Sequence, residues 1–371
     1  MPDPQKVEQL PVRLPDLTPK KLKNANFKDL TPKPPDWRRL YTAAESFRQL
    51  APWEWMDDDR IFGVKCPETG RIDYCGVLGA LGEVFALIAY EGAEGLNGYL
   101  KLLSGELQER SHVLEHQRCL MASFDDRSDL APEDLEVIRS LGLKFRGKNR
   151  WPMFRHYLPG YLPWFVTAPQ ARTLATCLEQ ALDVLPRYRQ NTALLGDPES
   201  GSLLVRVYGT QKGQDGWHDE ILPAPGEDPS PAESAELNVP IDEIGIARIR
   251  RQAKKCRGTW EIGYCYAPMP IREKREERPY LPRLLGIVDQ ESGMILSFRL
   301  EKSGEHLPIF RDIILASLGE RKFLPAHLLV DHDDVEALVA PMAAGLGITL
   351  HRVRELPAFA EALDALLATM G

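Results

Sequence analysis

The chain has 371 residues, 43% of them hydrophobic and 27% charged, which is the composition of a globular protein able to bury a core. Its length is too great for one ordinary domain and suits two. The formal net charge of -8 argues against general electrostatic attraction to nucleic acid or to anionic membranes.

The cysteines and the most hydrophobic segments indicate in which cellular compartment the protein is expected. Six cysteines are spread thinly over the chain and none forms a C-x-x-C pair, so zinc-ribbon spacing is absent. The first residues, MPDPQKVEQLP, lack the apolar core of a signal peptide. The best membrane candidate, VLGALGEVFALIAY, is short and contains Glu83. We therefore expect reduced thiols, a cytoplasmic location and no association with a membrane.

The sequence up to residue 222 predicts an arm followed by an α+β domain. Residues 1–35 are rich in Pro and Lys, which favours an extended arm. The segment DWRRLYTAAESFRQL carries an apolar stripe at helical spacing, with Asp36 as its expected N-cap. Further on, IFGVKCPETGRIDYCGV predicts a hairpin, EVFALIAY favours a strand over a helix, CLMASF predicts a strand, and PQARTLATCLEQALDVLPRY a long helix. We assign residues 36–222 to this domain.

A linker and a second domain follow. Residues 223–240, PAPGEDPSPAESAELNVP, are dense in Pro, Ser and acidic residues and predict a linker. Residues 241–371 contain three strand candidates, TWEIGYCYAP, RLLGIVDQ and MILSFRLEK, and then helices that alternate with the strands AHLLVD and ITLHRV. The order β-β-β-α-β-α-β-α predicts an antiparallel meander that continues into parallel strands, and therefore an α/β fold with a mixed sheet.

The C-terminal third resembles the ribonuclease H-like fold of retroviral integrases and cut-and-paste transposases. RLLGIVDQESGMILSFRL is similar to the second and third strands of an integrase core, and HLLVDHDDVEALVAPMAAGLGITLHRV to the fourth strand, the next helix and the fifth strand. Over nearly its full length, the chain also resembles an uncharacterised bacterial family of two-domain proteins, through PWEWM, PETGRIDYCGVLGALGEVFALIAYEGAEGL and FRGKNRWPMFRHYLPGYLPWF. That second resemblance implies no known activity.

The integrase resemblance implies a site in which three carboxylates hold two magnesium ions for an in-line phosphoryl displacement. Asp331, at the end of the fourth strand, matches the second carboxylate. Where such enzymes carry Trp-x-x-Asp this sequence reads WEIG, with Gly263 in place of the aspartate. Glu261 and, on the last helix, Glu361 are the remaining candidates. The resemblance therefore implies a degenerate metal site, and Asp331 or Asp333 is alternatively an N-cap of the following helix.

Two stretches of the chain are rich in Lys and Arg although the chain as a whole has a negative net charge. KFRGKNRWPMFRHYLPGYLPWF interleaves cations with aromatic rings, and RIRRQAKKCRG adds a second run of cations. Such surfaces suit single-stranded nucleic acid or a phosphorylated ligand. Alternatively, the aromatic stretch packs between domains, with arginine stems covering its rings. The candidate binding residues are Arg146, Lys148, Arg150, Trp151, Arg155, Arg250, Arg251, Lys254 and Lys255.

The leading functional hypothesis is a binding or adaptor protein without catalysis, with nucleic acid or another protein as its partner. It follows from Gly263, which stands where a catalytic carboxylate is needed. One alternative is a divergent nuclease in which Asp331, Glu261 and Glu361 hold Mg or Mn. Another is a scaffold that self-associates through exposed strand edges.

Overall fold

The computed structural model describes residues 30–104, 116–195, 201–211, 213–225, 243–252, 255–274, 277–304, 306–321 and 323–370. Contacts divide the chain into two compact units, which we treat separately. The N-terminal unit comprises Met1–Gly92, Cys119–His156 and Trp164–Ala224, and the C-terminal unit comprises Ala93–Arg118, Tyr157–Pro163 and Pro225–Gly371. Most of the arm and the linker expected at 1–35 and 223–240 lies outside the described residues.

The N-terminal unit is built on seven strands in the order β5-β4-β3-β2-β1-β6-β7. The sheet is mixed, because β1 pairs antiparallel with β2 and parallel with β6. The strands are β1 (Ile61–Lys65), β2 (Ile72–Leu78), β3 (Ala86–Glu91), β4 (Cys119–Asp125), β5 (Trp151–Tyr157), β6 (Ser202–Gln211) and β7 (Gln214–Pro223). The predicted hairpin is confirmed as β1 and β2, and the strand expected in EVFALIAY is β3, which begins at Ala86.

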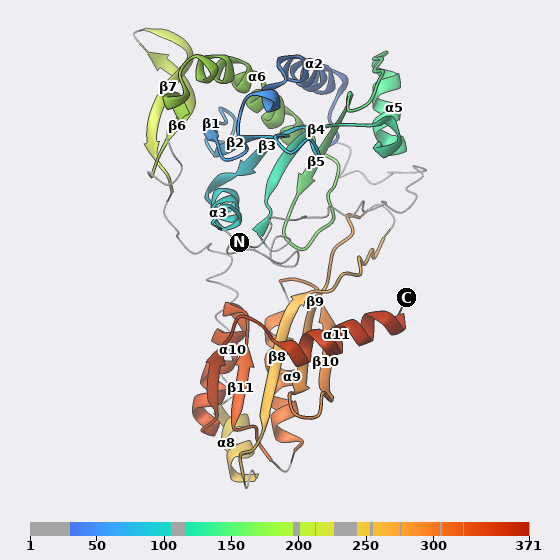
Figure 1. The fold of residues 1–371 in the computed structure, drawn as a ribbon, viewed down its shortest axis with the longest axis vertical. Helices are drawn as coiled ribbons and strands as arrows, with labels where there is room; N and C mark the ends of the chain where they lie inside the picture. Colours follow the sequence, from blue (N-terminus) through green and yellow to red (C-terminus); the bar gives the residue numbers. More distant parts are fainter. Residues whose placement is uncertain are drawn as a thin grey trace. The chain divides into compact units, whose positions relative to one another are not determined.

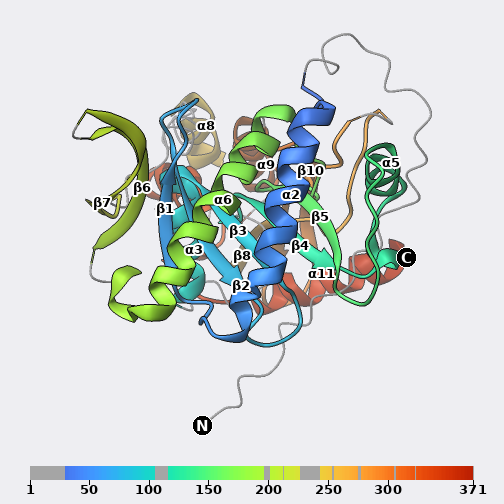
Figure 2. The same ribbon diagram turned by 90° about the horizontal axis from the view of Figure 1, so that it is seen from above.

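Two long helices, α2 (Pro34–Leu50) and α6 (Ala168–Gln190), lie side by side on one face of this sheet (Figure 2). Phe47 of α2 and Leu174 of α6 are fully buried in the core that these helices form with the strands. The long helix predicted from its apolar spacing is therefore confirmed. The shorter described helices of this unit are η1 (Pro52–Glu54), η2 (Arg127–Asp129), α5 (Pro132–Ser140) and η3 (Thr192–Leu195). The helix α3 (Gly92–Leu103) follows β3, and all of it except Gly92 belongs to the C-terminal unit.

The start of α2 differs from the prediction. Lys33 is the N-cap and Pro34 the first helical residue, a position where the fixed φ of proline suits a helix. Asp36 lies in the first turn, where its Oδ2 accepts a hydrogen bond from the backbone N of Lys33 at 3.0 Å. The expectation that Asp36 is the N-cap is therefore wrong; its carboxylate instead satisfies the backbone amide of the N-cap residue.

The C-terminal unit contains a five-stranded sheet in the order β10-β9-β8-β11-β12. Neighbours β8 and β9, and β9 and β10, are antiparallel, whereas β11 runs parallel to both β8 and β12. The strands are β8 (Thr259–Tyr266), β9 (Arg283–Asp289), β10 (Ile295–Glu301), β11 (His327–Val330) and β12 (Thr349–Arg352). The predicted order of elements is confirmed, and with it the α/β class.

Helices cover both faces of this sheet, with α11 crossing it in Figure 1. Ile246, Phe310 and Val339 bury α8, α9 and α10 in one core with the strands. Phe359 of α11 belongs to a separate core on the other face. The helices are α8 (Glu243–Gln252), α9 (His306–Gly319), α10 (Asp333–Leu346) and α11 (Pro357–Met370). Of these, α8 was not predicted.

A buried ion pair joins β5 to α5 in the N-terminal unit. Arg155 is 2% exposed, and its two terminal nitrogens donate to the Asp134 carboxylate at 2.5 and 2.9 Å. Its guanidinium carbon lies 4.6 Å from the centre of the Phe165 ring. The expectation that Arg155 contacts nucleic acid is therefore wrong, because its guanidinium is buried and already bonded to the Asp134 carboxylate.

We expect Asp134→Ala to lower the free energy of unfolding by about 3–5 kcal/mol, because it leaves the buried Arg155 without its carboxylate. The double variant Asp134→Leu/Arg155→Met removes both charges and should recover much of that loss. Urea denaturation of wild type, single and double variants measures the difference. A single variant as stable as the wild type would contradict this role for the pair.

Candidate functional site

An aromatic ring fills the position expected for the first carboxylate of the metal site. Gly263 of β8 pairs with Gly286 of β9, and the Phe359 ring from α11 lies over both. A Cβ atom at Gly263 would be 2.2 Å from this ring, and one at Gly286 would be 2.5 Å from it. Non-bonded carbon atoms prefer about 3.5–4.0 Å. An aspartate at position 263 is therefore incompatible with the ring in this place.

Glu261, two residues before Gly263 on β8, is hydrogen-bonded to α11. The residue is fully buried, at 0% exposure. Its Oε2 accepts a hydrogen bond from the backbone N of Phe359 at 2.8 Å, and its Oε1 accepts one from Gln290 Nε2 at 3.2 Å. Phe359 is in the first turn of α11, so the carboxylate satisfies an amide that the helix itself leaves unpaired. Glu261 thus serves as a helix cap.

The three candidate metal ligands are not brought together. The register of β8 and β11 puts Asp331 level with Gly263 rather than with Glu261. Glu361 is exposed, and it lies about 200° around α11 from Phe359, which faces the sheet. Among the residues that the structure describes, no group of three or more His, Cys, Asp or Glu side chains could hold a metal ion. The donor set for two Mg or Mn ions is therefore not assembled.

A histidine caps the helix that follows β11. His332 is the N-cap of α10, and its Nδ1 accepts a hydrogen bond from the backbone N of Asp334 at 3.3 Å. Asp333 is the first helical residue, and its carboxylate pairs with Arg352 at 3.1 Å. The expectation that Asp331 or Asp333 is the cap is wrong, although acids in the first turn do lie where the helix dipole favours them.

A buried cluster of rings lies at the carboxyl end of β8. The Tyr264 hydroxyl is 2.5 Å from His306 Nε2, and the ring centres of Tyr264 and His332 are 4.7 Å apart. The backbone N of Gly304 donates to His306 Nδ1 at 3.2 Å, so the proton of a neutral imidazole is on Nε2, which donates to Tyr264. Burial, together with the charge of Arg283, lowers the pKa of His306 to about 4. This cluster therefore contains the neutral imidazole of His306 and the guanidinium of Arg283, neither of which is an anionic ligand for a metal ion.

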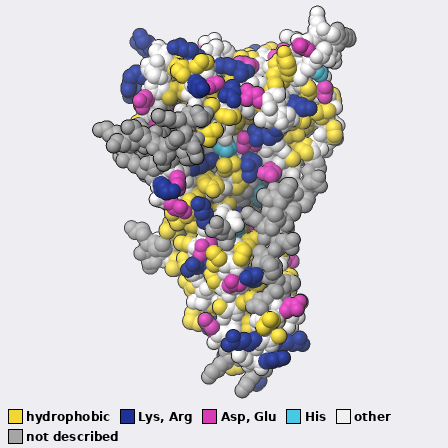
Figure 3. All heavy atoms as spheres, turned by 180° about the vertical axis from the view of Figure 1, so that it is seen from behind, with side chains coloured by type: hydrophobic (Ala, Val, Ile, Leu, Met, Phe, Trp, Pro, Cys, Tyr) yellow, Lys and Arg dark blue, Asp and Glu magenta, His cyan; other side chains and the backbone are white. Residues whose placement is uncertain are grey.

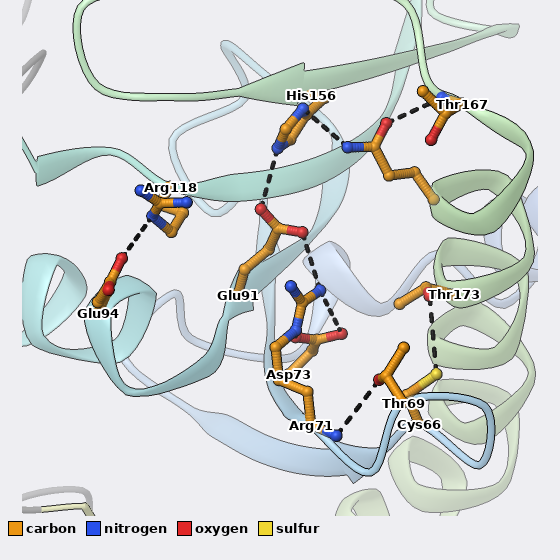
Figure 4. A network of polar contacts seen from close by, with 11 residues as sticks. Cys66, Thr69, Arg71, Asp73, Glu91, Glu94, Arg118, His156, Thr167 and Thr173 are labelled. Carbon is orange, nitrogen blue, oxygen red and sulfur yellow. Dashed lines mark hydrogen bonds and ion pairs between the residues drawn. The ribbon is translucent and has the colours of Figure 1, made fainter. Parts of the chain in front are cut away.

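A second polar cluster lies in the N-terminal unit, near the start of β2 and the ends of β3 and β5 (Figure 4). Asp73 and Glu91 are cross-strand partners on β2 and β3. Arg71 donates to Asp73 at 2.7 and 3.2 Å and to Glu91 at 2.8 Å. The other oxygen of Glu91 is 2.9 Å from His156 Nε2. Two buried carboxylates thus share one guanidinium, and a histidine from β5 extends the network.

Gln170 fixes the tautomer of His156. Its Oε1 accepts a hydrogen bond from the backbone N of Thr167, the N-cap of α6, at 2.8 Å. Its amide nitrogen must therefore be the donor to His156 Nδ1, at 2.9 Å. With Nδ1 as acceptor, Nε2 carries the ring proton and donates to Glu91. The contacts run without interruption from the start of α6 to β3, as expected for a buried network that rigidifies its surroundings.

The two carboxylates of this network differ in acidity. Burial raises the pKa of Asp73 to about 6, against the hydrogen bond and the charge of Arg71. Burial also opposes ionisation of Glu91, but the hydrogen bond from His156 and the charge of Arg71 outweigh it and lower the pKa. One buried acid therefore stays ionised while its neighbour can take up a proton near pH 6.

The first basic stretch is divided between the core and the surface. Arg146, Lys148 and Arg150 are exposed. Trp151 is half-buried and packs edge-on against Phe145, with ring centres 5.9 Å apart. Both rings also pack against the core of the N-terminal unit. The alternative of internal packing therefore describes Trp151 better than stacking on a base.

The second basic stretch lies in the C-terminal unit. Arg250 and Arg251 are exposed in the last turn of α8. Lys255 is exposed in the segment that leads into β8, and Lys254 lies outside the described residues. The candidate residues of the first stretch belong to the N-terminal unit and those of the second to the C-terminal unit, so we describe each set by itself.

Sequence reasoning missed the network around Asp73 and Glu91. Its only sequence signal is that each acid stands at the end of a strand with an apolar interior, IDYCGVL and ALIAYE. Ionisable residues are seldom fully buried unless paired, so such positions predict an ion pair only once the strands are known to be neighbours. The partner histidine, on β5, carries no such signal.

Comparison with known proteins finds two family models of unknown function, each of which matches one part of the chain. Residues 37–206 match the family model described as Domain of unknown function (DUF7309), and residues 245–367 match Domain of unknown function (DUF6930). The two matches fit a two-domain chain. A search of curated proteins finds no match. Among the described helices, none combines the length and the apolar character needed to cross a membrane.

We expect Gly263→Ala to lower the free energy of unfolding by about 1–3 kcal/mol, because the added methyl group must displace the Phe359 ring. In a Phe359→Leu background the ring is gone, and the same substitution should cost markedly less. Gly319→Ala is the control, since its Cβ would make only ordinary contacts, at 3.4 Å and beyond. Urea denaturation of the four-member cycle checks this; equal costs in both backgrounds would contradict the packing.

A second prediction concerns pH. Because the folded pKa of Asp73 is raised from 3.8 to about 6, the stability it contributes is fully present below pH 3.8 and is lost as the pH rises through about 6. The free energy of unfolding of wild type relative to Asp73→Asn should therefore fall by up to about 3 kcal/mol across this window. Asp219→Asn is the control of opposite sign, since hydrogen bonding from Arg187 lowers the pKa of Asp219. A pH-independent difference for Asp73→Asn would refute the shift.

Proposed function

We propose that this chain is a non-catalytic binding protein whose C-terminal unit is a ribonuclease H-like domain with a closed metal position. The observation that carries the proposal is the Phe359 ring over Gly263, where a two-metal phosphoryl-transfer site needs a carboxylate. A nuclease in which Asp331, Glu261 and Glu361 hold Mg or Mn is disfavoured by the same geometry, because Glu261 caps α11 and Glu361 is exposed.

The arrangement of strands supports the ribonuclease H-like part of the proposal. Taking β8 as the first strand, the order across the sheet is third, second, first, fourth, fifth. The first three strands are antiparallel, and the fourth and fifth are parallel to the first. Asp331 directly follows the fourth strand, at the position that the integrase resemblance assigns to a carboxylate.

A binding role is supported by the charges that remain at the surface. Both basic stretches expose cations despite a net charge of -8 for the chain. All six cysteines are free thiols, which suits a reducing cytoplasm. Exposed cations, together with the Phe359 ring at the expected metal position, favour a protein that holds an anionic partner without cleaving it.

The test is incubation of the full chain with end-labelled single- and double-stranded DNA and RNA in the presence of Mg²⁺ or Mn²⁺. We expect the nucleic acids to remain intact, because the donor set for two metals is incomplete. Asp331→Asn is run alongside, with Asp289→Asn as a control at a turn aspartate bonded to Ser292. Metal-dependent cleavage that is lost in Asp331→Asn but kept in Asp289→Asn would overturn the proposal.

A further inference from the structure

A set of exposed cations gathers at the end of the C-terminal sheet where β8 begins. Figure 3 shows Lys and Arg side chains at the end of this unit where α8 lies in Figure 1. Because Asp331 follows the other end of a strand parallel to β8, this surface is at the opposite end of the sheet from the closed metal position. The α8 surface, as we name it, consists of Arg248, Arg250, Arg251, Lys255, Arg257 and Arg321.

The helix that carries half of this surface is firmly docked. Ile246 and Ile249, one turn apart, are buried in the core of the C-terminal unit. Close approach to α10 depends on Gly345, where an added Cβ would lie 2.7 Å from Ile246. With its apolar side buried, α8 must present its arginines to solvent. Their backbone positions are therefore set before any ligand arrives.

Residues 255–257, which lead into β8, are also held by backbone hydrogen bonds. The backbone N of Arg257 donates to Leu324 O at 2.8 Å, and the backbone N of Leu324 donates to Lys255 O at 3.1 Å. The Arg257 guanidinium carbon lies 4.1 Å from the centre of the Phe323 ring, which is 36% exposed. A guanidinium stacked on a partly exposed ring offers both a charge and a flat surface.

Within the described part of the chain the members of this surface form no ion pair, although the charge of Arg321 acts on the nearby Asp289 carboxylate. Elsewhere, arginines pair with carboxylates, as Arg39 does with Glu179 at 2.7 Å and Arg299 with Glu301 at 2.6 Å. No described carboxylate forms an ion pair with any member of the α8 surface. The helix dipole favours cations in the last turn of α8, which accounts for Arg250 and Arg251 alone. It does not account for Lys255, Arg257 and Arg321, which lie outside the helix.

A groove between α8 and α10 adds shape to this charge. Arg250 and Arg251 line it together with Glu243, and its floor is apolar, formed by Ile246, Ala247, Pro341 and Gly345. A phosphate suits paired guanidinium groups, which can each donate two hydrogen bonds. The apolar floor suits the face of a base or sugar beside that phosphate.

We propose that the α8 surface binds single-stranded nucleic acid, with phosphates on its arginines and lysine and with bases against the groove and the Phe323 ring. The inference rests on the proposed function, since it names the partner of a protein that binds without cleaving. The first basic stretch is a weaker candidate, because its rings at Phe145 and Trp151 are turned into the core.

The experiment measures binding of labelled oligothymidine and oligouridine to the full chain over a range of salt concentrations. For single strands, the slope of log affinity against log salt changes by about 0.7 for each phosphate contact. Arg250→Ala/Arg251→Ala should therefore flatten the slope by about 1.4 and weaken binding by about tenfold. Lys255→Ala/Arg257→Ala should weaken binding and flatten the slope to a similar extent. This second double variant lies outside α8, so it tests the inference even if the first one disturbs that helix. Circular dichroism and thermal unfolding establish that each variant is folded.

The matched control is Arg299→Ala/Arg311→Ala, which removes the same charge from the same unit at arginines paired with Glu301 and Asp312. Its affinity and slope should stay at the wild-type values. Equal weakening by control and α8 variants, or equally tight binding of polyglutamate, would overturn the inference. Failure to bind either oligonucleotide would also overturn the inference. It would leave intact the separate expectation that the protein does not cleave nucleic acid in the presence of a metal ion. A preference between the two oligonucleotides identifies DNA or RNA as the partner.

Discussion

The contact between Glu261 and the start of α11 is the constraint on which the C-terminal unit depends. A buried carboxylate is costly unless it is hydrogen-bonded, and here the Phe359 amide, 98 residues further along the chain, supplies the bond. A charge-assisted bond of this kind contributes about 1.5–3 kcal/mol. Once that amide is fixed, the Phe359 side chain must lie over β8 and β9, and only glycine at 263 and 286 leaves room for its ring. The cap, the ring and the two glycines form one arrangement, and this arrangement occupies the expected metal position.

The N-terminal unit also turns carboxylates inward and pairs them with arginine side chains, although Asp134 in addition accepts a hydrogen bond from the backbone N of Ala131, the N-cap of α5, at 3.0 Å. Arg71 serves Asp73 and Glu91, and Arg155 serves Asp134. Removing one partner from such a pair leaves a buried charge, which costs more than the intact pair contributes. The guanidinium groups of these arginines are therefore already paired within the fold. The cations of the α8 surface differ in this respect, because binding an anion there breaks no ion pair among the described residues.

The fold was largely readable from the sequence, and the site was not. Apolar runs bounded by turn residues predict the strands of both sheets, because burial of alternate or continuous apolar residues is a local signal. The role of Glu261 is not local: it depends on an amide from the last helix. Arg155 looks like the other cations of its stretch until the fold puts Asp134 beside it. In α8 the buried residues are Ile246 and Ile249. Two apolar residues among the cations of RIRRQ do not form a clear apolar stripe, so the sequence predicts a cationic stretch there but not a helix.

The two ends of the C-terminal sheet now have different roles. In α/β sheets, ligands usually bind beyond the carboxyl ends of parallel strands, where loops and helix N-termini leave polar groups unsatisfied. Here that end is filled: Glu261 takes a helix amide, Phe359 covers the glycines, and the His332 imidazole caps α10. Each of these contacts stabilises the fold by using a group that a ligand would need. The amino end retains cations that form no ion pair with the described residues. Most of them lie on α8 and on the residues that lead into β8, which are held in place by contacts of Ile246, Gly345 and Leu324. Binding there incurs little ordering cost in the protein, which is why we assign the partner to that end.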